Sequence, residues 1–540
     1  MRSVLYALAL LTFTAISNAD SRTDPHAAHG LGKIDFPVSC SPAAQDQFTT
    51  ATLLLHHMTY PQAREAFEKA VAIDPQCAMA HWGIAMTLFQ PLWPTRPKPA
   101  DLQRGWNEVQ TAKRLHPQND REGLFITAAE AFFLEPSGTD YWLRIRRWEQ
   151  AQQKAFEALP DDSEAQVFYA LSHLATTPAD NPGREHADRA AAILLKVYER
   201  NPDHPGAMHY LVHANDVPGR EHELLEITNR YAQLAPDNPH ALHMPTHIYT
   251  RIGDWDGVIR GNLRAADAAL KYPAGEKGEY VWDEFPHAIE YLVYAYLQQG
   301  NDQAAAEQIK RLQTVGHIEP SFKTAFHSAS TPARYALERH AWNEAALIEP
   351  RQPADLDWDR FGWPEATAVF AHGLGAARLG DVAAAKASAQ RLQALEAATT
   401  STGETLFARN IGVLRLELDA WIAQAEKRTG PALELMHKAV ALETSTPKHA
   451  VTPAPTLPAG EQLGDLLMQQ KKPKEALEAY QQSLARYPNR FNSLHGAAQA
   501  AAASGDKANA RKYYEQLVAL AGQGTRQPPL KEAKAFLAAG

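Results

Sequence analysis

Segments rich in Ala and Leu that also carry Glu, Gln, Lys and Arg are separated by short polar turns along most of the chain, and runs of alternating β-branched residues are absent. These residues favour helix, and the missing alternation argues against sheets. The pattern predicts an all-α protein. The expected helices include residues 77–89, 101–115, 120–134, 141–159, 163–175, 184–199 and 256–270.

A turn with the same chemistry recurs between the expected helices. Glycine followed by aspartate, or by asparagine and aspartate, occurs at 253–254, 300–302, 380–381 and 505–506. Glycine favours the position just after a helix, and aspartate caps the start of the next one. The turns therefore predict helix–turn–helix pairs. Longer irregular stretches are expected at 271–279, 351–364 and 444–458.

Small and aromatic residues recur at fixed spacings within these pairs. Residues 63–75 have the spacing A-x3-F-x2-A-x4-P, and Ala476 and Tyr480 recur 34 residues later as Ala510 and Tyr514. This pattern resembles the tetratricopeptide repeat superfamily, whose period is 34 residues. The resemblance implies a right-handed superhelical solenoid of helix pairs. The first helix of each pair would line a concave groove that binds a protein or peptide partner.

The repeats set the expected organisation of the chain. A single helix pair cannot bury its apolar face, so stacked pairs share one long core. The predicted parts are a signal peptide at 1–19, a flexible segment at 20–42, a repeat domain with a His-rich centre at 43–443, a Pro-rich linker at 444–458 and a C-terminal repeat pair at 459–540.

The N-terminus has the layout of a secretory signal. Arg2 is followed by a short apolar stretch at 4–16, and Ser17, Asn18 and Ala19 provide small residues before Asp20. We expect cleavage between Ala19 and Asp20 and a periplasmic or secreted protein. The alternative is a buried N-terminal helix.

The chain has two cysteines, Cys40 and Cys77. The repeat pattern places each of them at the start of the first helix of a repeat, in two successive repeats. Those helix starts are expected to be neighbours, and disulfides persist in oxidising compartments. The prediction is a Cys40–Cys77 disulfide, with two buried thiols as the alternative.

Charge and motifs exclude several functions. The chain has 53 basic and 62 acidic residues, a net charge of −9, and no basic cluster, so nucleic acid is not an expected partner. No segment after the N-terminus is apolar enough to span a membrane. The sequence contains no P-loop, G-x-S-x-G elbow, dinucleotide fingerprint or H-E-x-x-H motif.

Histidine pairs mark two successive repeats. His209 and His213 are spaced i, i+4, and His243 and His247 repeat the pair 34 residues later. Residues at this spacing share one face of a helix. In the family resembled here, these first helices line the groove. Pro245 lies inside the second pair, where it is expected to kink the helix.

Neighbouring repeats extend the pattern, since residues 286–290 match 239–243 and place Glu290 where His243 stands. Such ligands suit zinc, copper, iron or manganese. The predicted metal ligands are His173, His209, His213, His243, His247 and Glu290. The predicted supporting residues are Asp216, His222, His240, His287 and Tyr294.

The function stays open at this point among several classes. The leading hypothesis is an exported repeat protein that binds a partner in its groove and carries a His-rich metal site. The alternatives are a metal-dependent hydrolase or oxidoreductase, a metal storage or delivery protein, and a groove in which the histidines are only hydrogen-bonded.

Overall fold

The computed structural model describes residues 30–539, apart from 118, 139, 181–183, 276–277 and 523. The predicted signal peptide, its cleavage position and the first ten residues of the predicted flexible segment lie outside the described residues.

The described chain is almost entirely helical, as the sequence predicts. The first part contains α1 (Pro42–His56), α2 (Tyr60–Ile73), α3 (Ala78–Met86), α4 (Pro99–Arg114), α5 (Asp120–Phe133), α6 (Tyr141–Ala158), α7 (Ser163–Ala175) and α8 (Glu185–Arg200). The centre contains α9 (Pro205–Asn215), α10 (Leu225–Leu234), α11 (Pro239–His243), α12 (Pro245–Ile252), α13 (Trp255–Ala269), β1 (Pro273–Ala274), β2 (Tyr280–Val281), α14 (Glu284–Gln298) and α15 (Asp302–Thr314). The last part contains α16 (Phe322–Glu338), α17 (Trp342–Ala345), a 3₁₀ turn (Trp358–Arg360), α18 (Gly362–Leu379), α19 (Val382–Ser401), α20 (Thr405–Ala425), α21 (Thr429–Thr444), α22 (Ala459–Gln469), α23 (Pro473–Arg486), α24 (Phe491–Ala503), α25 (Lys507–Ala521) and α26 (Gln527–Ala538).

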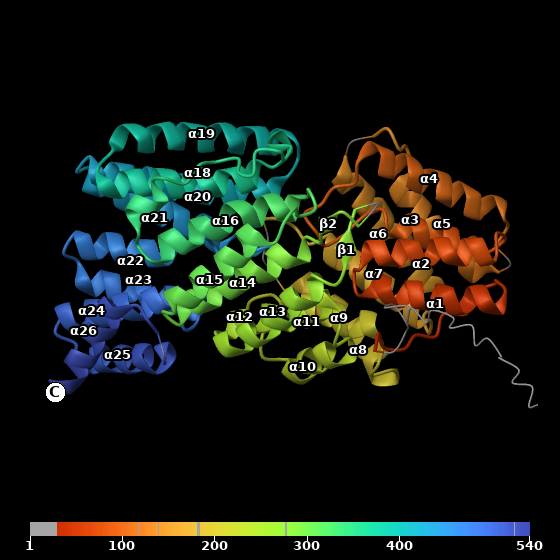
Figure 1. The fold of residues 1–540 in the computed structure, drawn as a ribbon, viewed down its shortest axis with the longest axis horizontal. Helices are drawn as coiled ribbons and strands as arrows, with labels where there is room; N and C mark the ends of the chain where they lie inside the picture. The colour runs from red at the N-terminus through yellow and green to blue at the C-terminus, as the bar shows by residue number, and fades with distance from the viewer. Residues whose placement is uncertain are drawn as a thin grey trace, which may run out of the picture.

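The glycine–aspartate turns join helices in the predicted way. Gly253, Gly380 and Gly505 adopt positive φ angles of 70°, 89° and 82°. The aspartate after each glycine caps the next helix, where its side chain accepts a hydrogen bond from a backbone N–H three residues on. The result is a row of helix pairs, an all-α helical repeat solenoid (Figure 1).

The solenoid curves until distant parts of the chain touch. α1–α7 and α18–α26 form its two ends, with α9–α16 between them (Figure 1). Arg96 donates to both carboxylate oxygens of Glu404, at 2.7 and 2.8 Å. The indole of Trp255 donates to the carbonyl of Asn489 at 2.8 Å. The inner side is therefore enclosed by the chain itself.

The segment 445–458 corrects the expected linker at 444–458. It joins α21 to α22, but Val451, Ala454 and Leu457 are at most 3% exposed. The guanidinium of Arg334 on α16 donates to the carbonyls of Pro455 and Ala454, both at 2.9 Å. One apolar cluster also extends from α16 through α21 to α26. The segment is a buried part of the solenoid because its carbonyls and apolar side chains find partners on the inner helices.

The part of the predicted flexible segment that the structure describes is also packed. Phe36 is 2% exposed, and its ring centroid lies 5.3 Å from that of Phe48 on α1 and 5.7 Å from that of Trp82 on α3. Burying a large aromatic ring anchors residues 30–41 to the first repeat. The prediction of flexibility is therefore wrong for these residues.

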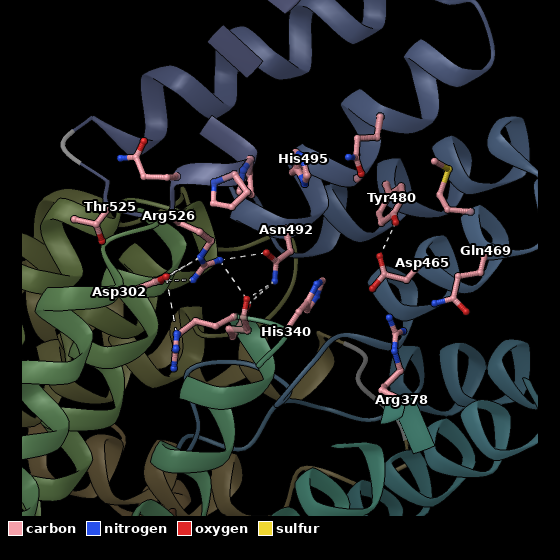
Figure 2. Close-up of a pocket in the computed structure, with 18 residues that line it drawn as sticks. Asp302, His340, Arg378, Asp465, Gln469, Tyr480, Asn492, His495, Thr525 and Arg526 are labelled. Carbon is pink, nitrogen blue, oxygen red and sulfur yellow. Dashed lines mark hydrogen bonds and ion pairs between the residues drawn. The ribbon is translucent and has the colours of Figure 1, made fainter. Parts of the chain in front are cut away.

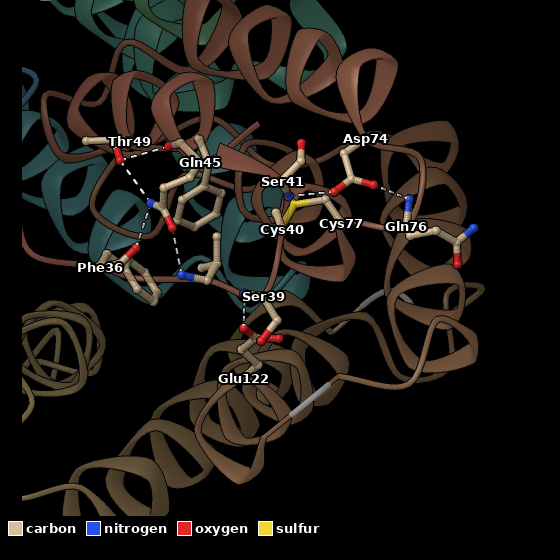
Figure 3. The surroundings of a disulfide bond; sticks show 12 residues. Phe36, Ser39, Cys40, Ser41, Gln45, Thr49, Asp74, Gln76, Cys77 and Glu122 are labelled. Carbon is tan, nitrogen blue, oxygen red and sulfur yellow. Dashed lines mark hydrogen bonds between the residues drawn. A yellow bond between two sulfur atoms is a disulfide. The ribbon is translucent and has the colours of Figure 1, made fainter. Parts of the chain in front are cut away.

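The predicted disulfide between Cys40 and Cys77 is confirmed (Figure 3). Cys40 precedes the first residue of α1, and Cys77 caps α3. The carboxylate of Asp74 accepts from the backbone N–H of Ser41 at 2.8 Å and holds the two helix starts together.

Two smaller features complete the fold. Pro245 divides one repeat helix into α11 and α12, which confirms the expected kink. Strands β1 and β2 pair antiparallel within and just after the insertion at 271–279, a small sheet that the sequence did not predict. Among the described residues, no helix has both the length and the apolarity needed to cross a membrane.

Candidate metal centre

The histidines come from the first helices of successive repeats. His209 and His213 lie on α9, His240 and His243 on α11, and His247 on α12. α14 and α16 add His287 and His327. Spacings of i, i+3 and i+7 place the three histidines of α11 and α12 on one side, facing α9 and α14.

Group A consists of His209, His213 and His240. The Nε2 atom of His209 lies 3.0 Å from Nε2 of His240 and 3.2 Å from Nε2 of His213. Two nitrogens bound tetrahedrally to one zinc or copper ion at about 2.0–2.1 Å would be about 3.3 Å apart. The separations in group A are close to that value.

Group B consists of His243, His247 and His287. The Nε2 atoms of His243 and His247 are 2.9 Å apart. One ring nitrogen of His287 lies within 4.8 Å of a ring nitrogen of each of the other two residues. All three side chains are buried.

The hydrogen-bond partners of the Nδ1 atoms determine which nitrogen of each ring carries the proton. The Nδ1 atoms of His209, His243 and His247 face the carbonyl of His56 at 2.6 Å, Oδ1 of Asn262 at 2.7 Å and the carboxylate of Asp216 at 3.0 Å. All three partners accept, since the amide nitrogen of Asn262 is already donating to the carbonyl of Val258. Each Nδ1 therefore carries the proton, and each Nε2 of a neutral ring offers a lone pair.

His240 and His287 follow the same pattern. Nδ1 of His240 lies 3.4 Å from the carboxylate of Glu284. Nδ1 of His287 lies 3.0 Å from Nε2 of His327, whose own Nδ1 donates to Glu290 at 2.5 Å. A second group that fixes the tautomer and orientation of an imidazole is the usual arrangement around a metal-ligating histidine.

Burial keeps the rings of His209, His243 and His247 neutral. It lowers the pKa of His247 to about 4, although the hydrogen bond to Asp216 acts in the opposite direction. Burial, with His247 as the next cause, holds the pKa of His243 well below its usual value. The pKa of His209 is also held well below its usual value, first by burial and then by the neighbouring His240. Neutral imidazole is the form that binds metal.

A third cluster, His56, Glu164 and His204, looks similar but differs in its partners. Nε2 of His56 donates to Glu164 at 2.8 Å, and Nδ1 lies 3.3 Å from the hydroxyl of Tyr210. Nδ1 of His204 accepts from the backbone of Ala207, so its Nε2 carries the proton that faces Glu164 at 3.2 Å. Burial would raise the pKa of Glu164, but His56 and His204 hold it below its usual range. The contact between Nε2 of His204 and Oε1 of Glu164 lacks hydrogen-bond geometry, so this cluster differs from groups A and B in facing a carboxylate rather than in being fully hydrogen-bonded.

Groups A and B face one small cavity. His213 and His240 from group A, and His247 and His287 from group B, line a space of about 20 Å³ together with Trp93. Such a space holds about one water molecule. Its remaining walls include His449 and Val451 of the buried segment.

A larger cavity of about 180 Å³, here called the antechamber, adjoins the small one. Both share Trp93, His213 and His449 as lining residues. The antechamber in turn shares Arg96, Trp142 and Phe407 with a cleft of about 1220 Å³. The three spaces therefore lie next to one another between the outside and the histidines.

The structure places some predicted site residues elsewhere. Nδ1 of His173 lies 3.2 Å from Glu149, and its ring stacks on His186, so it does not join the other histidines. Glu290 is bonded to His327 and Arg334 and contacts the cluster only through His327. Predicted ligands His209, His213, His243 and His247 do lie together.

Of the predicted supporting residues, some lie at the centre and others do not. Asp216 takes that role at His247, whereas His222 is exposed and the hydroxyl of Tyr294 accepts from Arg490. His240 and His287 are members of groups A and B rather than supports. The recurring Pro-His-Ala at 239–241 and 286–288 already marked both positions in the sequence.

Sequence reasoning missed several residues around the centre. They are Asn262, Glu284, His327, Lys448 and His449. Lys448 pairs with Asp216 at 2.9 Å across a separation that no sequence period relates. The position of Glu284 could have been noticed in the sequence, because it lies two residues before the recurring Pro-His-Ala at 286–288.

The sequence pattern of the tetratricopeptide repeat family matches residues 462–525. The helix pairs of the structure agree with that match. Residues 462–525 are therefore tetratricopeptide repeats, within a chain whose described part is an all-α solenoid of helix pairs. The matched part of this repeat protein spans α22 to α25, and the central repeats that carry the histidines lie outside it.

Comparisons over longer stretches show only distant likeness. No curated protein matches the chain. A solved structure titled "Crystal structure of APC/C hetero-tetramer Cut9-Hcn1" is 13% identical, with a TM-score of 0.36 over 92% of this chain and 76% of that one. The structure titled "Human IFIT1 dimer with PPP-AAAA" is 14% identical, with a TM-score of 0.39 over 88% of this chain and 89% of that one. We draw no functional argument from either.

Proposed function

We propose that this repeat protein holds transition-metal ions inside its solenoid, through groups A and B. The observation that carries the proposal is the facing pair of Nε2 atoms of His243 and His247 at 2.9 Å, while both Nδ1 atoms are committed to oxygen acceptors. Without a cation between them, two lone pairs would repel, or one ring would hold a second proton that burial disfavours.

The arrangement of each group adds to this support. Three protein ligands leave one coordination position open, as in catalytic zinc sites. The hydrogen-bonded partners of five of the six rings pre-orient the ligands. The proposed protein is therefore a repeat scaffold with an internal metal centre, reached through the antechamber.

The test is metal content. The full chain is expressed with its own N-terminus, purified without chelator and analysed by elemental mass spectrometry, beside the double variant His209→Ala/His243→Ala. We expect about one to two equivalents of one metal per wild-type chain, one ion for each of groups A and B. That metal should be lost in a variant that circular dichroism shows to be folded.

A matched control separates the centre from ordinary surface histidines. His222 is exposed and is not a member of group A or group B, so His222→Ala should keep the full metal content. If the wild type contains no metal, even after soaking with zinc or copper, the histidines are a hydrogen-bonded lining and the proposal fails.

A second proposed function is partner binding at a cleft of about 670 Å³ between the inner helices of the last repeats (Figure 2). Arg378 points into this cleft, and its guanidinium lies 4.5 and 4.1 Å from the ring centroids of Trp342 and Trp421. Its buried Nη1 atom has no hydrogen-bond partner among the described residues. The positive charge of Arg378 at the wall of the cleft favours an acidic side chain of a partner protein.

The partner cleft is tested with a fluorescent oligoglutamate peptide and titration of tryptophan fluorescence. Replacing Arg378→Gln should weaken binding by at least about tenfold, the usual cost of a lost charged hydrogen bond. Arg511→Gln, on α25 where the side chain is partly exposed, should not change it. Equal binding by all three proteins would refute this function.

We further propose that the protein is exported. The Cys40–Cys77 disulfide supports an oxidising compartment, in line with the signal-like sequence before Asp20. N-terminal sequencing of the protein purified from the cell envelope of an expressing bacterium should begin at Asp20. A cytoplasmic protein that retains Met1 or Arg2 would contradict export.

A further inference from the structure

Groups A and B belong to one centre. Each contributes two residues to the wall of the same 20 Å³ cavity. Ring centroids across the groups are 6.4 Å apart both for His213 with His247 and for His240 with His243. Ions held by the two groups would therefore face each other across a space that has room for one small molecule.

The ligand chemistry narrows the metal. All six candidate ligands are imidazoles, and the carboxylates of Asp216, Glu284 and Glu290 contact rings at their far nitrogens. Hard cations prefer oxygen ligands, and mononuclear non-haem iron sites typically add a carboxylate to two histidines. Copper is the divalent ion that binds nitrogen ligands most tightly in its row.

The antechamber indicates what reaches the centre. Its walls include Trp93, Trp142 and Phe407, with Leu92 and Leu406. A largely apolar cavity of about 150 Å³ accommodates benzene, so the 180 Å³ antechamber fits a molecule built on one aromatic ring. Such a molecule would lie against His213, which lines both cavities.

Building on the proposed metal binding, we propose that groups A and B hold a pair of copper ions that oxidises a small aromatic diphenol with dioxygen. Two cuprous ions together supply two electrons, and the 20 Å³ cavity between the groups is where dioxygen would enter. Two diphenol molecules each lose two electrons and two protons to give two quinones. One dioxygen molecule takes up the four electrons and four protons, and its O–O bond breaks to give two water molecules.

The first experiment examines the copper pair itself. Chelator-treated full-length protein is loaded anaerobically with cuprous ion, exposed to air and freed of excess metal. We expect about two copper ions per chain and an electron paramagnetic resonance signal much smaller than two isolated cupric ions give, because neighbouring cupric spins cancel. A full signal from two ions would show separate sites and overturn the pair.

The second experiment examines the reaction, with 4-methylcatechol as the probe and an oxygen electrode. We expect one dioxygen consumed per two catechols, at a rate well above that of the same copper bound to albumin. Leu406→Trp narrows the antechamber from α20, far in sequence from every ligand, and should lower kcat/KM about tenfold or more with unchanged copper content and resonance signal. Leu379→Trp, at an exposed position of α18, should keep the wild-type rate.

The outcomes separate the two proposals. Failure to bind any metal refutes the proposed function and this inference together. Two bound copper ions without oxygen uptake above the albumin control overturn the oxidase inference and leave metal binding in place. Equal rates for Leu406→Trp and wild type overturn the assignment of the antechamber as the substrate route.

Discussion

The cluster of His56, Glu164 and His204 and group B are both buried groups of three residues built on histidines, yet they differ in where the ring protons point. In the first cluster two N–H groups point at one carboxylate, and the remaining nitrogens meet a hydroxyl and a backbone N–H. In group B the N–H groups of His243 and His247 point outward, and two lone pairs face each other.

This difference teaches that burial and residue type alone do not identify a metal site. A buried cluster whose N–H groups face a carboxylate balances its own charge and stabilises the helices it joins, here α1, α7 and the turn before α9. A cluster with acceptors facing acceptors is complete only with a cation. The following predictions test that distinction, from the largest expected effect to the smallest.

The variant Glu164→Ala should give the largest effect, because it should lower stability without changing metal content. Removing a buried carboxylate that faces two imidazoles leaves both N–H groups unpaired, and we expect a loss of about 3–5 kcal/mol in the free energy of unfolding. Metal content should stay at the wild-type level. Urea denaturation in chelator measures the first quantity and elemental analysis the second. Loss of metal in a folded Glu164→Ala protein would show that this cluster also binds an ion.

The pH dependence of the metal-free protein should follow group B. His247 has a pKa of about 4 in the folded protein and about 6.5 in the unfolded chain. The unfolded chain therefore binds the proton first, so stability is full above pH 6.5 and falls as the pH decreases toward 4. The loss from this residue is about 3 kcal/mol, measured by denaturation at several pH values in chelator. Stability that rises on acidification over this range would contradict neutral rings.

A smaller effect, on metal affinity, is expected from Asn262, whose side-chain oxygen accepts from Nδ1 of His243. Asn262→Ala removes the oxygen that holds Nδ1 of His243, and loss of such a partner lowers metal affinity about 10–100-fold. Competition with a chromophoric chelator measures the affinity. Asn410→Ala is the matched control, because Asn410 also donates to the carbonyl four residues earlier in its helix but lies far from the centre in the chain. Equal affinities in both variants would mean that Asn262 plays no part in metal binding.

The smallest effect is expected at His173, which the sequence grouped with the ligands. His173 makes one side-chain contact with Glu149 at 3.2 Å, so His173→Ala should cost about 1 kcal/mol of stability, the net worth of a single hydrogen bond. Metal content should not change. A drop in metal content in this variant would bring His173 back into the centre.

The sequence already contained most of the fold. Helix propensity, capping aspartates and turn glycines act over a few residues, so the bounds of α5, α6 and α7 agree closely with the expected segments. Pro245 broke its helix where the missing N–H requires it. The burial of segment 445–458 was not predictable, because prolines indicate an extended chain both in an exposed linker and in a buried irregular segment.

The candidate site was predictable only in part. The 34-residue period identified four ligands because each repeat places the same position on the same face. The match of Glu290 to His243 failed. His287, three residues before Glu290, reaches group B instead, because the period fixes the helix but not the rotation of α14 against α11.

The sequence by itself determined the helix pairs, the repeat period, the disulfide and the four histidines at 209, 213, 243 and 247. Only the tertiary structure decided that His240 and His287 complete two groups of three, and that Lys448 and His449 return from a distant segment to close the cavity. It also decided that His56 and His204 face the carboxylate of Glu164. Local propensities act within a helix, whereas the direction of each imidazole proton depends on acceptors that other helices bring to it.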